Sequence, residues 1–145
     1  MENKFERDYQ EETRIEKAFM EAVEKGDQDA IKKAIEAQNL LRTALQSEGE
    51  IFTEIYQEYK RARDNGNKAL NFRHNVKKTG EYLECLKKNG IERFTFSEDF
   101  GGGLDGAWEW QEAGCRVVGL TKIQGEKSPF SEEHEKMAAL IFTIE

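Results

Sequence analysis

Length, composition and charge exclude several classes of protein for this chain. It has 145 residues, 35% of them charged, and a formal net charge of −7. This length favours one domain with a modest hydrophobic core, and no apolar run approaches the roughly 20 residues of a transmembrane helix. The chain begins MENK, a charged start without the apolar segment of a signal peptide. We therefore expect a cytoplasmic protein with no membrane-spanning segment.

The charges follow an acid–base–acid pattern. Residues 1–59 contain 8 basic and 15 acidic side chains, residues 60–88 contain 9 and 3, and residues 89–145 contain 5 and 11. Only the middle segment is basic enough to attract phosphate.

The N-terminal half is predicted to be helical. Apolar residues recur every three or four positions over residues 5–23, 31–45 and 51–59. Gly26-Asp27 is typical of one helix ending and the next being capped, and Asn65-Gly66 is a turn signal. We place a helical N-terminal region at 1-66 and an α+β C-terminal domain at 67-145.

In the C-terminal domain a further helical pattern runs over residues 69–86, with a break expected at Gly80. Residues 93–97 then alternate polar and apolar as a half-buried strand does, and residues 115–123 are rich in β-branched residues. A third strand is predicted over 137–144, after a polar loop. The predicted fold is α+β, with a small three-stranded mixed sheet (αβαββ) and helices on one face. We expect the first two strands to form a parallel pair and the third to return antiparallel.

A glycine-rich loop, Gly101-Gly102-Gly103, lies between the first predicted strand and the following helix. Together with Gly106 it gives Gly-x-Gly-x-x-Gly spacing, and such loops bind phosphate at a helix N-terminus. However, no Lys or Arg lies between Arg93 and Arg116, and carboxylates would repel phosphate. The acidic residues around the loop are Glu98, Asp99 and Asp105. A plain connecting loop is therefore favoured over a nucleotide site, and we expect no cofactor.

Residues 96–104 and 112–119 resemble the first motif of cytosine-5 DNA methyltransferases, in FSEDFGGGL and EAGCRVVG. The resemblance implies binding of S-adenosylmethionine. It covers about 25 residues and then fails, because Lys122-Ile123-Gln124 stands where the family has an acidic residue for the ribose. There is also no Pro-Cys nucleophile, since Cys115 lies inside a predicted strand. A degenerate S-adenosylmethionine-binding module stays open as an alternative.

No other motif predicts a metal site or an enzyme. Cys85 and Cys115 lack C-x-x-C spacing and are interpreted as free thiols. His74 and His134 are the only histidines, and neither has a second histidine at helical spacing. We expect no metal and no catalysis.

Two clusters remain as candidate binding residues. Trp108 and Trp110 are two positions apart in a predicted helix, so one is expected in the core and the other partly exposed as a binding anchor. A basic band could contact nucleic acid or pair with the acidic N-terminal helices, and charge balance favours the pairing. The band consists of Lys60, Arg61, Arg63, Lys68, Arg73, Lys77 and Lys78.

Residues 80–145 resemble a family of small proteins carried on phages, plasmids and integrative elements of Firmicutes. The shared pattern is a helix ending in Asn89-Gly90, the strand FTFS, a helix ending AGC, and a strand with VVGL, followed by the final ALIF strand. The resemblance implies an accessory protein that counters a host defence protein. The lead hypothesis is a non-enzymatic anti-CRISPR inhibitor of a type II RNA-guided nuclease. We expect the partner to contact Glu98, Asp99, Asp105, Trp108 and Trp110. A nucleic-acid-binding accessory protein is the alternative, and self-association stays open.

Overall fold

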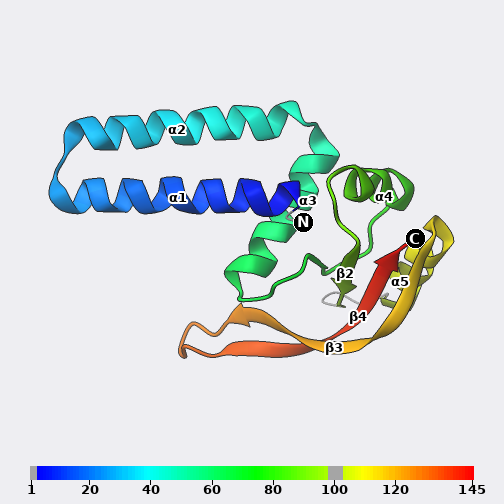
Figure 1. Ribbon diagram of the computed structural model, residues 1–145. Helices are drawn as coiled ribbons and strands as arrows, with labels where there is room; N and C mark the ends of the chain where they lie inside the picture. The colour runs from blue at the N-terminus through cyan, green and yellow to red at the C-terminus, as the bar shows by residue number, and fades with distance from the viewer. Residues whose placement is uncertain (1–2, 98–102) are drawn as a thin grey trace.

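The computed structural model describes residues 3–97 and 103–145 and has an α+β fold, as predicted (Figure 1). Within these residues the elements are α1 (Lys4–Lys25), α2 (Gln28–Ser47), α3 (Glu50–Asp64), β1 (Asn71–Phe72), α4 (Thr79–Lys88), β2 (Arg93–Phe96), α5 (Gly103–Ala113), β3 (Cys115–Lys127) and β4 (His134–Ile144). Helices α1, α2 and α3 precede the first strand in the chain, and α4 and α5 lie between strands of the sheet. The mixed sheet has four strands among the described residues, where three were predicted.

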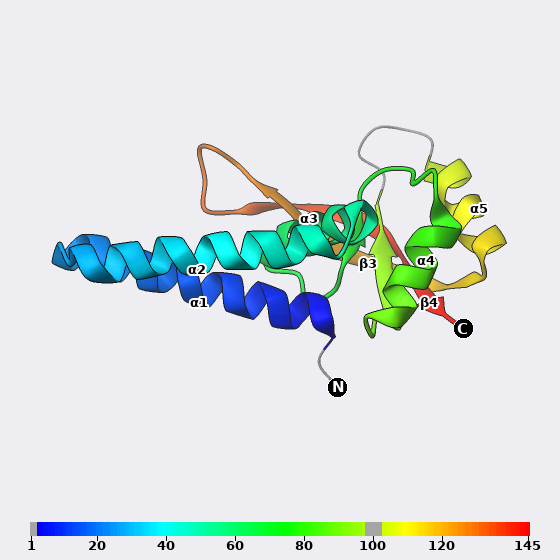
Figure 2. The same cartoon turned by 90° about the horizontal axis from the view of Figure 1, so that it is seen from above.

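The first two helices form an antiparallel hairpin, which we call the helical arm (residues 4–47). Gly26 ends α1 in the left-handed conformation, with φ 66°, which glycine adopts without strain. The Asp27 side chain then accepts a hydrogen bond from the Ala30 N–H and caps α2. The outer part of the arm projects away from the rest of the molecule in both views (Figures 1 and 2). We call the remainder, α3 to β4, the body.

The strand order is β1-β2-β4-β3, with β4 antiparallel to both of its neighbours and β1 parallel to β2. The predicted parallel pair is therefore wrong in one respect. β2 and β3 run in the same direction, but β4 lies between them, and Phe142 is opposite Phe94 on one side and Val117 on the other. In its central position β4 forms backbone hydrogen bonds along both of its edges. At the edge of the sheet, one side of the strand would lack backbone partners.

Two segments differ from the prediction. Residues 69–76 were predicted to be helical, but Phe72 is paired with Phe96 in a short parallel strand, and the Ser97 N–H donates to the Phe72 carbonyl at 2.9 Å. Strands β3 and β4 also extend further than predicted, so the connecting loop shortens to residues 128–133. α4 begins only at Thr79.

One hydrophobic core joins the arm to the body. On one face of the sheet Phe94 packs on Trp110 of α5 and on Phe142 of β4, with ring centroids 4.7 and 5.4 Å apart. Phe72 contacts both Trp110 and Tyr82 of α4. These contacts confirm that α4 and α5 cover the same face. The same cluster extends through α3 to residues of α1, so the core crosses the boundary predicted at residue 66. Its buried members from α1 and α3 are Phe5, Phe52, Ile55, Tyr56 and Tyr59.

Candidate functional site

The outer face of α5 carries an exposed apolar pair. Leu104 is 89% exposed and Trp108 is 60% exposed, and their spacing of four residues puts them on one side of the helix. Trp108 is therefore the exposed tryptophan of the two, as the sequence predicted for one of them. An exposed tryptophan among polar neighbours is the residue type that most often anchors a protein–protein contact.

Trp110 was predicted as a partner contact, and this is wrong in the conformation described. Its side chain is fully buried, and its ring lies 4.7 Å from that of Phe94 and 5.2 Å from that of Phe72. The physical reason is the small residues at positions 106 and 107, one turn earlier on the same face. Gly106 and Ala107 are buried and let α5 approach the sheet closely enough for the indole to enter the core.

Carboxylates surround the exposed pair. Asp105, Glu109 and Glu112 of α5 are all exposed, and the helix has no basic residue. Asp105 lies in the first turn, where the helix dipole favours negative charge. Glu98 and Asp99, with Gly101 and Gly102, lie outside the described residues. The α5 face, defined here as Leu104, Asp105, Trp108, Glu109 and Glu112, is therefore acidic with an apolar centre.

Two members of the basic band connect α3 to the arm. The Arg63 guanidinium donates to both oxygens of Glu6, with its shortest contact at 2.8 Å. Lys60 donates to Glu12 at 3.0 Å and Glu16 at 3.3 Å. Pairing between the basic band and the acidic N-terminal helices is thus confirmed for Lys60 and Arg63.

Burial and these contacts shift the pKa values of Glu6 and Tyr59. Burial raises the pKa of Glu6, but hydrogen bonds from Arg63, Tyr59 and Gln10 outweigh it and hold the pKa below its ordinary value. Burial also raises the pKa of Tyr59, to about 12, with a further contribution from the hydrogen bond to Glu6. The phenol therefore stays a hydrogen-bond donor over the physiological pH range.

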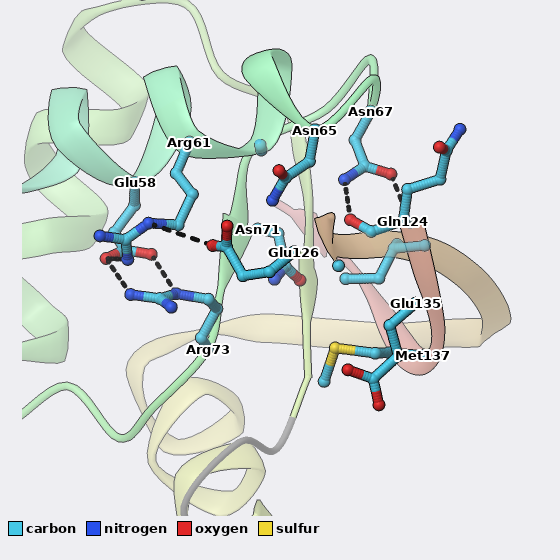
Figure 3. A pocket seen from close by; sticks show the side chains of 13 residues that line it. Glu58, Arg61, Asn65, Asn67, Asn71, Arg73, Gln124, Glu126, Glu135 and Met137 are labelled. Atoms are coloured by element: carbon cyan, nitrogen blue, oxygen red, sulfur yellow. Dashed lines mark hydrogen bonds and ion pairs between the residues drawn. The ribbon is translucent and has the colours of Figure 1, made fainter. Parts of the chain in front are cut away.

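Two other basic residues, Arg61 and Arg73, lie beside a cavity of about 300 Å³ between α3 and the β3–β4 hairpin (Figure 3). Glu58 accepts from Arg61 at 3.3 Å and from Arg73 at 3.2 and 3.4 Å. Arg61 also lies 3.7 Å from Glu126 of β3. Arg61 therefore lies between carboxylates of α3 and of the hairpin, whereas the ion pair of Arg73 with Glu58 connects the segment after β1 to α3.

A second set of contacts at this cavity was missed by sequence reasoning. The Asn67 side chain donates to the Gln124 carbonyl at 2.7 Å and accepts from the Gln124 N–H at 2.9 Å (Figure 3). A carboxamide thereby pairs with β3 as a neighbouring strand would. Deeper in the sheet, Asn71 donates to Ser97 and accepts from Thr95. The residues that these hydrogen bonds connect are 24 to 57 positions apart in the sequence, so no local sequence pattern predicts the contacts.

The polar groups around this cavity are largely engaged with one another. Its floor is apolar, from Ala62, Ile123 and Met137. No serine or cysteine is among the residues that line this cavity, so the lining provides no such nucleophile beside a general base. It supports a structural joint between α3 and the hairpin.

The remaining members of the basic band are exposed. Lys68, Lys77 and Lys78 have no ion pair with any residue within 3–97 or 103–145. Lys77 and Lys78 adjoin the start of α4, whereas Lys68 lines a separate cavity near Arg93. The seven basic residues thus do not form one continuous stripe of free charge.

The cysteines and histidines do not assemble a site. Both cysteines are free, and burial raises the pKa of the Cys115 thiol to about 11 and also raises that of Cys85. His134 precedes the third strand predicted over 137–144, but in the structure it begins β4, where its Nδ1 lies 2.8 Å from the Gly125 carbonyl oxygen. Over the described part of the chain no three His, Cys, Asp or Glu side chains are grouped as metal ligands are.

Helices in the described ranges are too short or too polar to cross a membrane. No curated protein and no solved structure matches the chain. One family does match, over residues 54–144, which begin within α3 and include the whole sheet, α4 and α5 but not the helical arm. The chain therefore belongs to the family described as Domain of unknown function (DUF7698).

Proposed function

We propose that this protein binds and inhibits a host defence protein in the cytoplasm without catalysing a reaction. The partner we propose is a type II RNA-guided nuclease, so that the protein acts as an anti-CRISPR inhibitor. The observation that carries the proposal is the α5 face, where Leu104 and Trp108 are exposed among carboxylates. The class of partner follows from the resemblance of residues 80–145 to small proteins of phages and other mobile elements.

The chemistry of the α5 face favours a basic partner. Complementary charge speeds and orients association, while a central tryptophan provides apolar contact area. An RNA-guided nuclease holds its nucleic acids in a positively charged channel. Carboxylates at positions 105, 109 and 112 would meet such cations in place of phosphates. By occupying the channel, or by holding the nuclease inactive, the protein would prevent cleavage.

The test is a guided DNA-cleavage assay with purified protein. We expect Glu109→Lys combined with Glu112→Lys to weaken both binding and inhibition by about tenfold or more, equal to about 1.4 kcal/mol. The matched control is Glu36→Lys with Glu48→Lys, two exposed positions in and beside α2 that carry the same change of charge. The control should inhibit like the natural protein.

Two outcomes would contradict the proposal separately. Full inhibition by the α5 double variant would show that the α5 face is not the contact. Failure of the natural protein to bind or inhibit type II nucleases would remove the proposed partner. Charge reversal at Glu98 and Asp99 in the same assay asks whether the contact extends beyond α5.

A second candidate function is binding of nucleic acid, favoured by the exposure of Lys77 and Lys78. It predicts a mobility shift with plain duplex or single-stranded DNA that weakens steeply as salt rises. Lys77→Gln with Lys78→Gln should abolish that shift. A shift that is absent at low salt would exclude this function.

A further inference from the structure

A second cavity, which we call the α1–β2 cavity, lies where the start of α1 meets the N-terminal ends of β1 and β2. Its volume is about 300 Å³, and segments that are far apart in the sequence surround it. The Lys4 N–H donates to the Asn89 carbonyl at 3.1 Å, which holds the start of α1 against the turn after α4. The walls come from this turn, from α3 and from the residues that precede β1 and β2.

The parallel pairing of β1 and β2 places two cationic side chains at this cavity. Asn71 lies opposite Thr95, and the Thr95 N–H donates to the Leu70 carbonyl at 2.9 Å. Two residues earlier in both strands, the same register brings the segment with Lys68 beside Arg93. Both side chains are exposed, and both residues line the cavity.

Neither of these cations has an acidic partner among the residues that the structure describes. The body contains five arginines. An ion pair with a described carboxylate is found for four of them, Arg61, Arg63, Arg73 and Arg116. Within residues 3–97 and 103–145 no ion pair joins Arg93 or Lys68 to a carboxylate. Glu92 is the one acidic residue in the lining, so the lining has a net charge of +1 in a chain of net charge −7.

The inner wall of the α1–β2 cavity is apolar. Leu70 is 1% exposed and Ile91 is 6% exposed. The Tyr59 ring is buried beside them, and its hydroxyl donates to Glu6 at 2.9 Å. The cavity therefore combines an apolar wall with cationic side chains that reach solvent. Small-molecule sites commonly have this combination, in which a few polar groups orient a ligand against apolar surface.

The start of α1 adds to the positive potential that the two side chains create. Asn3 lines the cavity and caps the helix, because its side chain accepts from the Glu6 N–H at 2.8 Å. The N-terminus of a helix carries a partial positive charge, whose effect falls off within the first turn. The side chains of Lys68 and Arg93 remain the main source of attraction for an anion.

We infer that the α1–β2 cavity binds a small organic phosphate, with its phosphate group between Lys68 and Arg93 and its apolar part against Leu70 and Ile91. A phosphate monoester carries a charge of about −1.5 to −2 at pH 7, which two cations match better than they match the single charge of a carboxylate. The arginine fork can donate two parallel hydrogen bonds to phosphate oxygens, and the lysine adds a point charge. The cavity shares no residue with the α5 face, so this inference does not depend on the proposed function.

The experiment titrates the full, ¹⁵N-labelled chain with phenyl phosphate and follows the amide resonances by NMR at constant ionic strength. We expect a Kd of about 1 mM or lower, with the largest shifts at residues 68–70 and 90–93. Inorganic phosphate should bind more weakly, because it lacks the apolar contact. Benzoate should also bind more weakly, because it carries a single charge.

Variants at the two cations test the assignment of the phosphate group. Lys68→Gln and Arg93→Gln should each weaken binding of phenyl phosphate at least about tenfold. Because both side chains are exposed, the circular dichroism spectrum should stay unchanged. The matched control is Lys77→Gln, which removes an exposed lysine outside the cavity and should bind like the natural protein. Glu92→Gln removes the acidic residue of the lining and should bind at least as tightly as the natural protein.

Several results would overturn the inference. One is the absence of binding by the natural protein at about 10 mM phenyl phosphate. Another is a set of resonance shifts confined to residues outside the cavity, or an equal loss of binding in Lys77→Gln and Lys68→Gln. Benzoate that binds as tightly as phenyl phosphate would contradict the assignment to phosphates and would indicate a site for carboxylates.

Discussion

The helical arm and the body are ordered by different kinds of contact. In the body, stacked and edge-on aromatic rings from α5 and three strands fill one face of the sheet without exposure to solvent, as Phe72, Phe94, Trp110 and Phe142 show. In the arm, Ala34 is the one residue of α2 that is buried, and charged groups such as Glu6 and Glu12 connect α1 to α3. Phe5 of α1 belongs to the aromatic core, because its ring stacks on those of Phe52 and Tyr59. Substitutions in that core should therefore cost the free energy of aromatic packing, while substitutions in the charged link between α1 and α3 should act through polar contacts.

The largest expected effect separates the two tryptophans. Trp110→Ala removes the indole at the centre of the aromatic cluster and should lower the free energy of unfolding by about 3–5 kcal/mol. Trp108→Ala removes a side chain that is 60% exposed and should change it by about 0.5 kcal/mol or less. Urea denaturation followed by circular dichroism measures both. Equal losses for the two variants would contradict the assignment of Trp110 to the core.

A somewhat smaller effect tests how closely α5 approaches the sheet. A methyl group at Gly106 would lie 2.6 Å from Cζ of Phe96 and would also collide with the Asn75 side chain. Gly106→Ala should therefore destabilise the body by about 1–3 kcal/mol, even though alanine is the better helix former. Gly80→Ala, also within a helix but with open space around its Cα, is the control and should not be destabilising. Greater stability of Gly106→Ala than of the natural protein would contradict the packing.

The smallest expected effect concerns the polar link between the arm and α3. Glu6→Gln weakens the contacts with Arg63 and Tyr59 and should cost about 1 kcal/mol, because the groups are partly exposed. The loss should exceed that of Glu11→Gln, since Glu11 pairs with Arg14 within α1. Thermal unfolding of the two variants measures the difference.

We also predict that the difference in stability between the natural protein and Glu6→Gln depends on pH. Folding lowers the pKa of the Glu6 carboxyl group. Its carboxylate therefore contributes to the free energy of unfolding above the pKa of the unfolded state, near 4.5, and this contribution is lost as the pH falls through the lower pKa of the folded state. The natural protein and Glu6→Gln should thus differ at neutral pH and converge in acid. A difference that grows below pH 4.5 would contradict this sign.

The sequence predicted the α+β class and three of the four strands that the described residues form, because hydrophobic period is a local property. It did not predict their order. That order depends on β4, whose last residues pair on both sides, with Phe142 opposite Phe94 and Val117. The helical spacing of Phe72 and Val76 predicts a helix over residues 69–76, but the pairing of Phe72 with Phe96 forms a short strand there. Long-range pairing overrode the local pattern.

The candidate site was predictable to a similar degree. The spacing of the two tryptophans requires that they differ in exposure. The small residues Gly106 and Ala107 lie on the side of α5 that faces the core, and their positions in the sequence indicate that Trp110 is the buried one. The internal pairing of Lys60 and Arg63 followed from charge balance. The hydrogen bonds between Asn67 and Gln124 could not be predicted, because two polar residues 57 positions apart form no recognisable pattern in a single sequence.

The most direct test of the proposed function uses the contrast between the two tryptophans. The chain has only these two, so protein labelled with 5-fluorotryptophan gives one ¹⁹F NMR resonance for each, and Trp108→Phe assigns them. On addition of an unlabelled type II RNA-guided nuclease, we predict that the Trp108 resonance shifts and loses its sensitivity to exchange from H₂O to D₂O, while Trp110 keeps its chemical shift. A complex in which Trp108 stays as exposed to solvent as in the free protein would contradict binding through the α5 face.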